Sequence, residues 1–186
     1  MPPKPKIKKE MIINAGKEVI QSEGIENLNV RKIASKLNCS TQPIMYHYKT
    51  VAELKSDIYS EIDQYHSAYI MNIENSSLNP MLSIGIRYIL FAYEEKNYFK
   101  FLFQSNKFSN MSFNGLFDDD ELSMIYSILA QEAHITKMQS KELFENLFIM
   151  VHGLASLLAN NAMEYDEEYC IKILENTFNS LIKNYK

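Results

Sequence analysis

The side chains best suited to contact an anionic polymer gather in one short stretch of this sequence. Arg31 and Lys49 bring positive charge, whereas Gln42 and Tyr46 bring hydrogen-bonding groups. Arginine and glutamine can form paired hydrogen bonds to a base edge, and lysine and hydroxyl groups suit phosphate. The stretch therefore has the chemistry of a nucleic-acid contact. The candidate contact residues are Arg31, Ser40, Thr41, Gln42, Pro43, Tyr46, His47 and Lys49.

Two short helices joined by a tight turn would position these side chains. Asn29 is a suitable N-cap for the first helix, and Ser40 is a suitable N-cap for the second. Pro43 falls in the first turn of the second helix, where the backbone N–H has no intrahelical partner. Helix, turn, helix is the geometry that lays a second helix in the DNA major groove. The first helix is indicated by apolar residues that share one helical face: Val30, Ile33, Ala34 and Leu37.

The residues of this corner also form a recognisable set. They comprise Asn29, Arg31, Ile33, Ala34 and Leu37, then Asn38-Cys39-Ser40, then Ile44-Met45-Tyr46-His47-Tyr48, then Lys49. With these residues, the run from about Ile12 to Leu54 resembles the DNA-binding domain of the tetracycline-repressor (TetR/AcrR) family of bacterial transcription factors. Two positions depart from that family's pattern. Met45 stands where the family usually has a phosphate-contacting tyrosine, and Val51 stands where it usually has a lysine.

Charge divides the chain into unequal parts. Residues 1–55 carry a net charge of +5, and residues 56–186 carry −9. A basic front and an acidic rear suit a DNA-contacting head on a body that DNA repels. With only 5 glycines and 5 prolines, the composition favours helices over a turn-rich β fold. The Pro/Lys tail, residues 1–6, could lie along phosphates or could simply be solvated.

We therefore expect an all-α protein with about nine helices. Residues 1–53 would form a basic arm and an N-terminal three-helix helix-turn-helix DNA-binding domain. Residues 54–186 would form a C-terminal helical ligand-binding and dimerisation domain. Thr50 and Glu53 form a capping box that opens a long helix from Val51 to Glu74, the rigid link between head and body.

A ligand pocket is expected in the body, although aromatic residues at helical spacing are more often plain core. The chain has 22 Phe and Tyr residues, many of them between Tyr59 and Tyr126. An aromatic lining would suit a small, largely apolar inducer. The candidate pocket residues are Ile62, Tyr65, Tyr69, Ile86, Tyr93, Phe103 and Tyr126.

The last two helices are expected to make a homodimer. The segment from Leu147 to Ala159 is apolar on nearly every side, so a helix there must be covered all round. A final helix carries apolar residues at the spacing of a helix-packing seam. Two helices from each chain would form a four-helix bundle with two-fold symmetry. The candidate interface residues are Phe148, His152, Leu174, Phe178 and Leu181.

Catalysis and metal binding find little support. The four histidines and two cysteines show no metal-ligand spacing, and the scattered glycines form no phosphate-binding loop. Asp118, Asp119 and Asp120 fit a helix start better than a metal site. We expect no catalytic residues, no metal and no cofactor. Without a signal peptide or a bilayer-length apolar segment, a cytoplasmic protein that does not engage membranes is expected.

Three hypotheses follow. The first is a homodimeric repressor that binds a palindromic double-stranded DNA operator and is released by a small-molecule inducer. The second is a DNA-binding regulator of the same fold that answers to a protein partner instead. The third is a helical bundle whose corner is purely structural. Specific DNA binding separates the third from the others, and ligand-induced release separates the first from the second.

Overall fold

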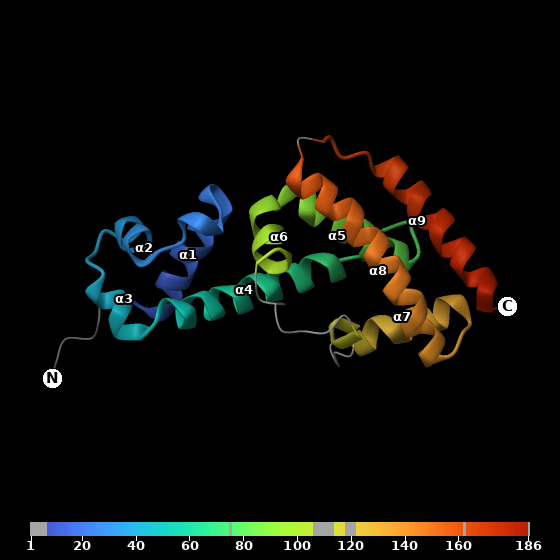
Figure 1. Cartoon of the computed structure of the whole chain (residues 1–186), viewed down its shortest axis with the longest axis horizontal. Coiled ribbons are helices and arrows are strands. Elements are labelled where there is room, and N and C mark those ends of the chain that lie inside the picture. The colour runs from blue at the N-terminus through green and yellow to red at the C-terminus, as the bar shows by residue number, and fades with distance from the viewer. Residues whose placement is uncertain (1–6, 75, 106–113, 118–121, 162, 186) are drawn as a thin grey trace. The chain divides into compact units, whose positions relative to one another are not determined.

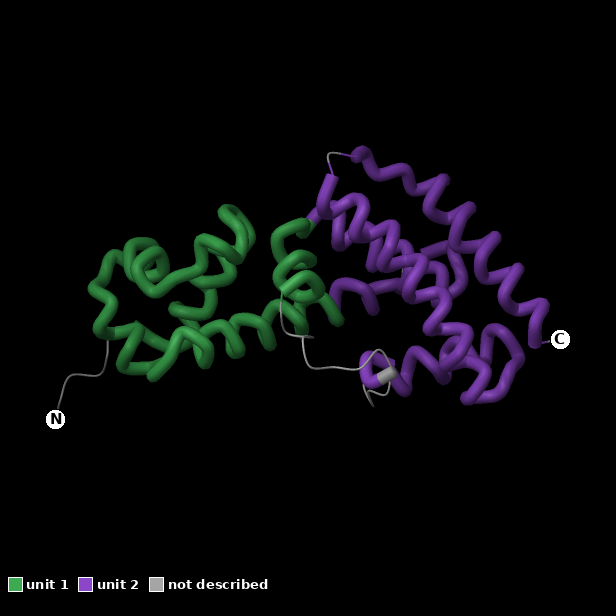
Figure 2. The backbone as a smooth tube through the Cα atoms, viewed as in Figure 1, with its two compact units in different colours: residues 1–67, 95–105 green, residues 68–94, 106–186 purple. Residues whose placement is uncertain are grey.

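The protein is all-helical, as the sequence predicts (Figure 1). The computed structural model describes residues 7–74, 76–105, 114–117, 122–161 and 163–185, which hold nine α-helices. The Pro/Lys tail and the acidic run 118–120 lie outside these described residues. The chain divides into two compact units (Figure 2), unit 1 with residues 1–67 and 95–105 and unit 2 with residues 68–94 and 106–186.

Unit 1 is a small helical unit built around α1. One face of α1 is apolar, so Ile12, Val19 and Ile20 are fully buried. Gly24 ends this helix with φ 84°, a left-handed value that glycine adopts without strain. Its helices are α1 (Lys9–Glu23), η1 (Ile25–Asn27), α2 (Val30–Lys36), α3 (Gln42–His47), the first turns of α4 (Val51–Met71) and α6 (Lys96–Phe103).

The first turns of α4 belong to the core of this unit. Leu54 and Ile58 are at most 1% exposed. A Cβ atom built on Gly16 would lie 2.4 Å from Ile58 Cδ1, so the absence of a side chain on α1 lets α4 approach it closely. The predicted domain boundary at 53/54 falls in the first turn of α4, whereas the contact units divide at Ser67. The two divisions differ because α4 is one continuous helix.

Several helix ends differ from the prediction. Thr41, not Ser40, is the N-cap of α3, because α2 closes with Asn38 at φ 48° and the connecting turn takes one more residue. The end of α4 is Met71 rather than Glu74, because the backbone turns after that residue, with Ile73 N–H donating to Met71 O. The predicted Thr50 cap is present, and its Oγ1 accepts from Glu53 N at 3.1 Å.

Unit 2 is organised around α5 and α8, which pack against each other. Thr136 and Gln139 form a capping box at the start of α8. A Cβ atom on Gly85 of α5 would lie 2.5 Å from Leu174 Cδ2, so α9 packs closely on α5. The elements are the last turn of α4, α5 (Pro80–Glu94), η3 (Asn114–Phe117), α7 (Ser123–Ala133), α8 (Lys137–Asn160), α9 (Glu167–Ile182) and η5 (Lys183–Tyr185).

By length and composition alone, α8 could cross a membrane, which the sequence reading did not expect. It is the one such helix among the residues described. In this fold α8 packs against α5, α7 and α9, so it serves as the central helix of unit 2. Core helices commonly have this composition.

Candidate nucleic-acid interface

The short helix α3 presents its polar face outward and is anchored by its apolar face. Ile44 is fully buried and Tyr48 is 3% exposed. On the other face Thr41 and Gln42 are exposed, and Tyr46 is 77% exposed. A tyrosine with three quarters of its surface in water gains little from burial, so its place on this face suits contact with another molecule. Pro43 is half-buried in the first turn.

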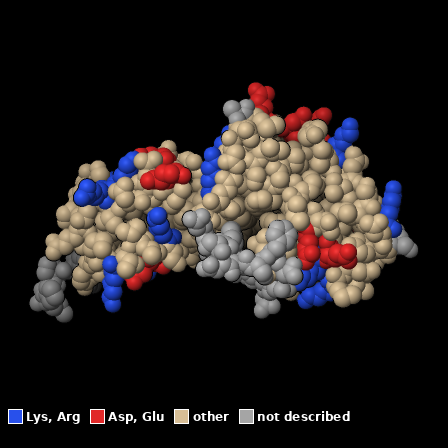
Figure 3. All heavy atoms as spheres, viewed as in Figure 1, with Lys and Arg blue, Asp and Glu red and all other residues tan. Residues whose placement is uncertain are grey.

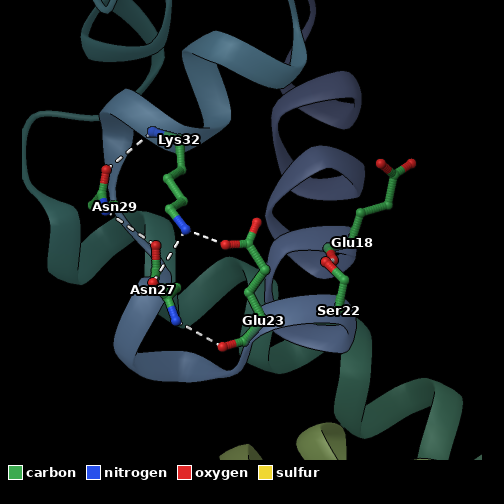
Figure 4. Close-up of polar contacts among 6 residues, drawn as sticks. All are labelled: Glu18, Ser22, Glu23, Asn27, Asn29 and Lys32. Carbon is green, nitrogen blue, oxygen red and sulfur yellow. Dashed lines mark hydrogen bonds and ion pairs between the residues drawn. The ribbon is translucent and has the colours of Figure 1, made fainter.

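The lysines of α2 are engaged within unit 1. Lys36 Nζ lies 3.1 Å from Glu18 Oε2 on α1. The Lys32 ammonium donates to the Glu23 carboxylate and, at 3.1 Å, to Asn27 Oδ1 (Figure 4). Asn29 also caps α2, as predicted, by accepting from Lys32 N at 3.0 Å (Figure 4). These pairs fix α2 against α1 and reduce the positive charge that α2 can offer.

Arg31 and Lys49 remain as exposed cations beside this corner. Within the described part of the chain neither side chain takes part in a salt bridge. They are the cations best placed to meet a phosphate or a base edge. On the face drawn in Figure 3, acidic side chains lie among the basic ones over unit 1. The net charge of the unit therefore does not by itself locate a surface that could bind nucleic acid.

His47 is half-buried and forms contacts within unit 1. Its Nε2 atom lies 2.9 Å from the carbonyl oxygen of Ile7, and its ring meets the Tyr46 ring edge-on at 5.5 Å. The imidazole therefore joins the end of α3 to the residues that precede α1 and supports the exposed tyrosine. A contact from His47 to nucleic acid stays a prediction.

A second polar network fixes the exit from α3. The Tyr48 hydroxyl donates to Asp57 Oδ2 at 3.1 Å, and Lys9 Nζ lies 2.6 Å from the same oxygen. Lys9 Nζ also lies 5.3 Å from the centre of the Tyr48 ring. The hydrogen bond from Lys9 lowers the pKa of Asp57, which therefore stays charged. This network connects α1, α4 and the residue that ends α3.

Comparisons with known proteins support the fold alone. The chain matches no protein-family model and none of the curated proteins. Its fold is similar to the crystal structure of a transcriptional regulator from Rhodococcus sp. Rha1, with a TM-score of 0.63 and 14% identity. The similarity covers 96% of this chain and 97% of that one, so the two share their architecture over nearly the full length.

The predicted pocket residues divide between the two units. Ile62 is fully buried in unit 1, where Tyr65 donates to Glu95 Oε1 at 3.1 Å and the Phe103 ring lies 5.2 Å from that of His66. In unit 2, Tyr69 donates to Glu94 Oε2 at 2.5 Å, and Tyr126 donates to Phe117 O at 2.7 Å. Ile86 is buried there, and Tyr93 stacks on Tyr165.

A cavity of about 640 Å³ opens in unit 2. None of the seven predicted pocket residues is among those that line it. It is bounded by the end of α4, the start of α5 and one face of α7. Periodicity did not single out its lining residues, because the turn between α4 and α5 brings them together. Its lining residues are Met71, Ile73, Pro80, Met124, Ile128, Gln131, Glu132 and His134.

The predicted interface residues have unequal exposure. Leu174 is 3% exposed and packs on α5 within the same chain, whereas Phe148, His152, Phe178 and Leu181 are half-buried. The exposed stripe of α8 holds Ile149 and Leu157, each about half exposed, on either side of exposed Gly153.

Proposed function

We propose that this protein is a DNA-binding transcriptional regulator that resembles the TetR/AcrR family and works in the cytoplasm. The observation that carries the proposal is the outward face of α3, where Tyr46 is 77% exposed beside exposed Thr41 and Gln42. Such groups match base edges and phosphates. The fold shared with a transcriptional regulator supports the proposal.

The distribution of cations supports the same surface. Because Lys32 and Lys36 are paired with α1, Arg31 and Lys49 would supply the positive charge next to α3. Arg31 would read a base edge, and Lys49 would bind the phosphate backbone. The proposed contact residues also include Ser40, which is exposed just before α3.

Selection of genomic DNA fragments by the purified full-length protein tests this function directly. We expect enrichment of one inverted-repeat sequence. Replacement of Gln42 by alanine should weaken binding to that sequence by about 1–3 kcal/mol in fluorescence anisotropy. Gln64→Ala, at an exposed position of α4, is the matched control and should bind as the wild type does. Recovery of no preferred sequence would exclude a sequence-specific regulator.

The proposed regulator acts as a homodimer on a palindromic operator. Two α3 helices would read two half-sites one turn of DNA apart, about 34–36 Å. The exposed apolar stripe on α8 supports such a pairing. We propose repression rather than activation. A regulator that leaves DNA when it binds an inducer can act by occupying the operator alone, without a contact to the transcription machinery.

A small apolar inducer would control the protein through α4. This helix is continuous from Val51 to Met71, with its first turns in unit 1 and its last turn in unit 2. An inducer that binds more tightly to one orientation of α4 would shift the population toward the corresponding distance between the two α3 helices of the dimer. Operator DNA must then weaken inducer binding by the same factor. The alternative is that a protein partner, rather than a small molecule, controls DNA binding.

A further inference from the structure

The cavity of unit 2 combines an apolar wall with one carboxyl group. Met71, Ile73, Met124 and Ile128 lie along the wall together with Pro80. Methionine side chains are flexible and polarisable, so they adapt to varied apolar ligands. The volume of about 640 Å³ lies within the usual range for small-molecule sites.

Glu132 is the acidic group of this cavity, and its two oxygens have different surroundings. Its Oε1 atom accepts a hydrogen bond from the Met81 backbone N–H at 3.1 Å, in the first turn of α5. Its Oε2 atom is buried and has no hydrogen-bond partner among the described residues. A buried carboxyl oxygen without a donor is costly, and a water, an ion or a ligand group could supply the hydrogen bond.

The charged form of the Glu132 carboxyl is destabilised by burial. Burial raises the pKa of this carboxyl, whereas the hydrogen bond from Met81 lowers it. A cation placed at Oε2 would favour the charged form and complete its hydrogen bonding. Gln131 and exposed His134 stand at the same cavity and add polar groups, but neither supplies the missing donor in this structure.

We propose that this cavity binds an apolar primary amine. Because Oε2 is buried, the Glu132 side chain would turn toward the cavity so that this oxygen accepts from the ammonium group, while the hydrocarbon lies against the methionine and isoleucine side chains. A fatty acid is disfavoured because its carboxylate would face Glu132. A neutral alcohol could donate one hydrogen bond but would gain no ionic attraction. The site thus selects by charge at one end and by apolar contact along the rest.

The site itself does not depend on the proposed function, but an effect on DNA does. Met71, the last residue of α4, lines the cavity, and the first turns of α4 pack in unit 1. An amine that moves Met71 would therefore act on the helix that the proposed coupling uses. The inference names the inducer class as apolar amines.

Isothermal titration of the full-length protein with octylamine, 1-octanol and octanoate tests the site, because each probe has eight carbon atoms and one polar end group. Octylamine should bind at least about tenfold more tightly than 1-octanol, and octanoate should bind most weakly. Glu132→Gln retains the acceptor for Met81 and should remove the preference for octylamine. Glu175→Gln, at an exposed position of α9, is the matched control and should retain it.

Ile128→Trp provides a second variant, since a larger side chain should fill the cavity and weaken all three probes. Equal affinities for octylamine and 1-octanol, or a preference that survives in Glu132→Gln, would overturn the inference. Operator binding measured with and without octylamine separates the two proposals. Selective octylamine binding with unchanged operator affinity supports the site and rejects the amine as an inducer. Absence of selectivity in the wild type, with intact operator binding, rejects the site and leaves the DNA-binding function standing.

Discussion

The hydroxyl of Tyr88 and Nδ1 of His152 lie 2.8 Å apart and join α5 to α8 inside unit 2. Burial lowers the pKa of His152, so the imidazole is neutral at pH 7. One ring nitrogen can then accept a hydrogen bond from the Tyr88 hydroxyl. The Phe148 ring stacks on the imidazole at 5.4 Å. This polar pair lies within an aromatic cluster that also holds Phe117 and Phe144. His152, an interface candidate from its sequence position, is therefore also a contact between two helices of one chain.

Replacement of Tyr88 by phenylalanine should lower the free energy of unfolding by about 1 kcal/mol. The change keeps the ring and removes this hydrogen bond, whose net worth is of that order. Urea denaturation followed by circular dichroism measures the difference. Tyr169→Phe is the matched control, because Tyr169 is 55% exposed and its hydroxyl can bond to water. Equal losses in the two variants would mean that the Tyr88 contact adds no stability.

Acid should destabilise the protein partly through His66. This residue is 6% exposed, and burial lowers its pKa from 6.5 to about 4. The unfolded chain therefore takes up a proton at a higher pH than the folded chain does. The stability that His66 contributes is complete above about pH 6.5 and is lost as the pH falls toward about 4, by roughly 3 kcal/mol.

Chemical denaturation of the wild type and of His66→Leu across pH 7.5 to 4 checks this sign. The difference in unfolding free energy between the two proteins should shift in favour of the leucine variant as the pH falls. His134→Leu, at an exposed position, is the control for a histidine in water. A difference between wild type and His66→Leu that does not change with pH would show that His66 titrates normally in the folded protein.

Most of the helix ends could be predicted from the sequence. Local signals were reliable: Asn29, Gly24 and the Thr136–Gln139 box act at the helix ends where their chemistry predicts. Ser40 failed as a cap because the left-handed Asn38 before it lengthens the turn, an effect that a capping preference alone does not include. Most of these caps could be predicted because they depend on residues close in the sequence, and Ser40 is the exception.

Packing across the chain was harder to foresee. Leu174 fits a seam on α9, but the spacing of apolar residues does not say whether the seam faces another chain or the same one. In the structure it meets Gly85, which has no side chain to keep α9 away. The pairing of Lys32 with Glu23 likewise depends on how α1 and α2 come together. Such contacts depend on tertiary geometry, which helical periodicity does not contain.

Arg31 and Lys49 should have distinguishable roles in DNA binding. Arg31→Ala should weaken specific binding by about 1–3 kcal/mol and relax the preferred sequence, because a base contact is lost. Lys49→Ala should weaken specific and random DNA alike and reduce the salt dependence of binding by about one unit. Fluorescence anisotropy at several salt concentrations measures both effects. Lys172→Ala, at an exposed position of α9, is the control for the loss of one positive charge. Identical behaviour of the Arg31 and Lys49 variants on the two DNAs would contradict the division of roles.

Two chains should pair through the exposed apolar stripe of α8. Ile149 and Leu157 are 52% and 51% exposed, and they lie two turns apart on one face of the helix. Between them a Cβ atom built on Gly153 would meet no atom within 4 Å. The stripe is therefore open within a single chain, and a glycine at its centre lets a second helix approach closely. Leu174 is unsuitable for a test of pairing, because a charge there would disrupt the core of the chain itself.

Ile149→Asp and Leu157→Asp should convert a dimer of about twice 21.7 kDa into folded monomers. Each change would bury an unpaired charge in the pairing face, at a cost of several kcal/mol, yet would leave that charge in water in the monomer. Gly153→Leu should act in the same direction by blocking the approach of the second helix. Size-exclusion chromatography with light scattering reports the mass, and circular dichroism reports the fold. Met11→Asp, on an exposed methionine of α1, supplies the control for an added charge and should remain dimeric. A wild type that stays monomeric at high concentration would contradict the dimer, whereas variants that stay dimeric would place the contact on another surface.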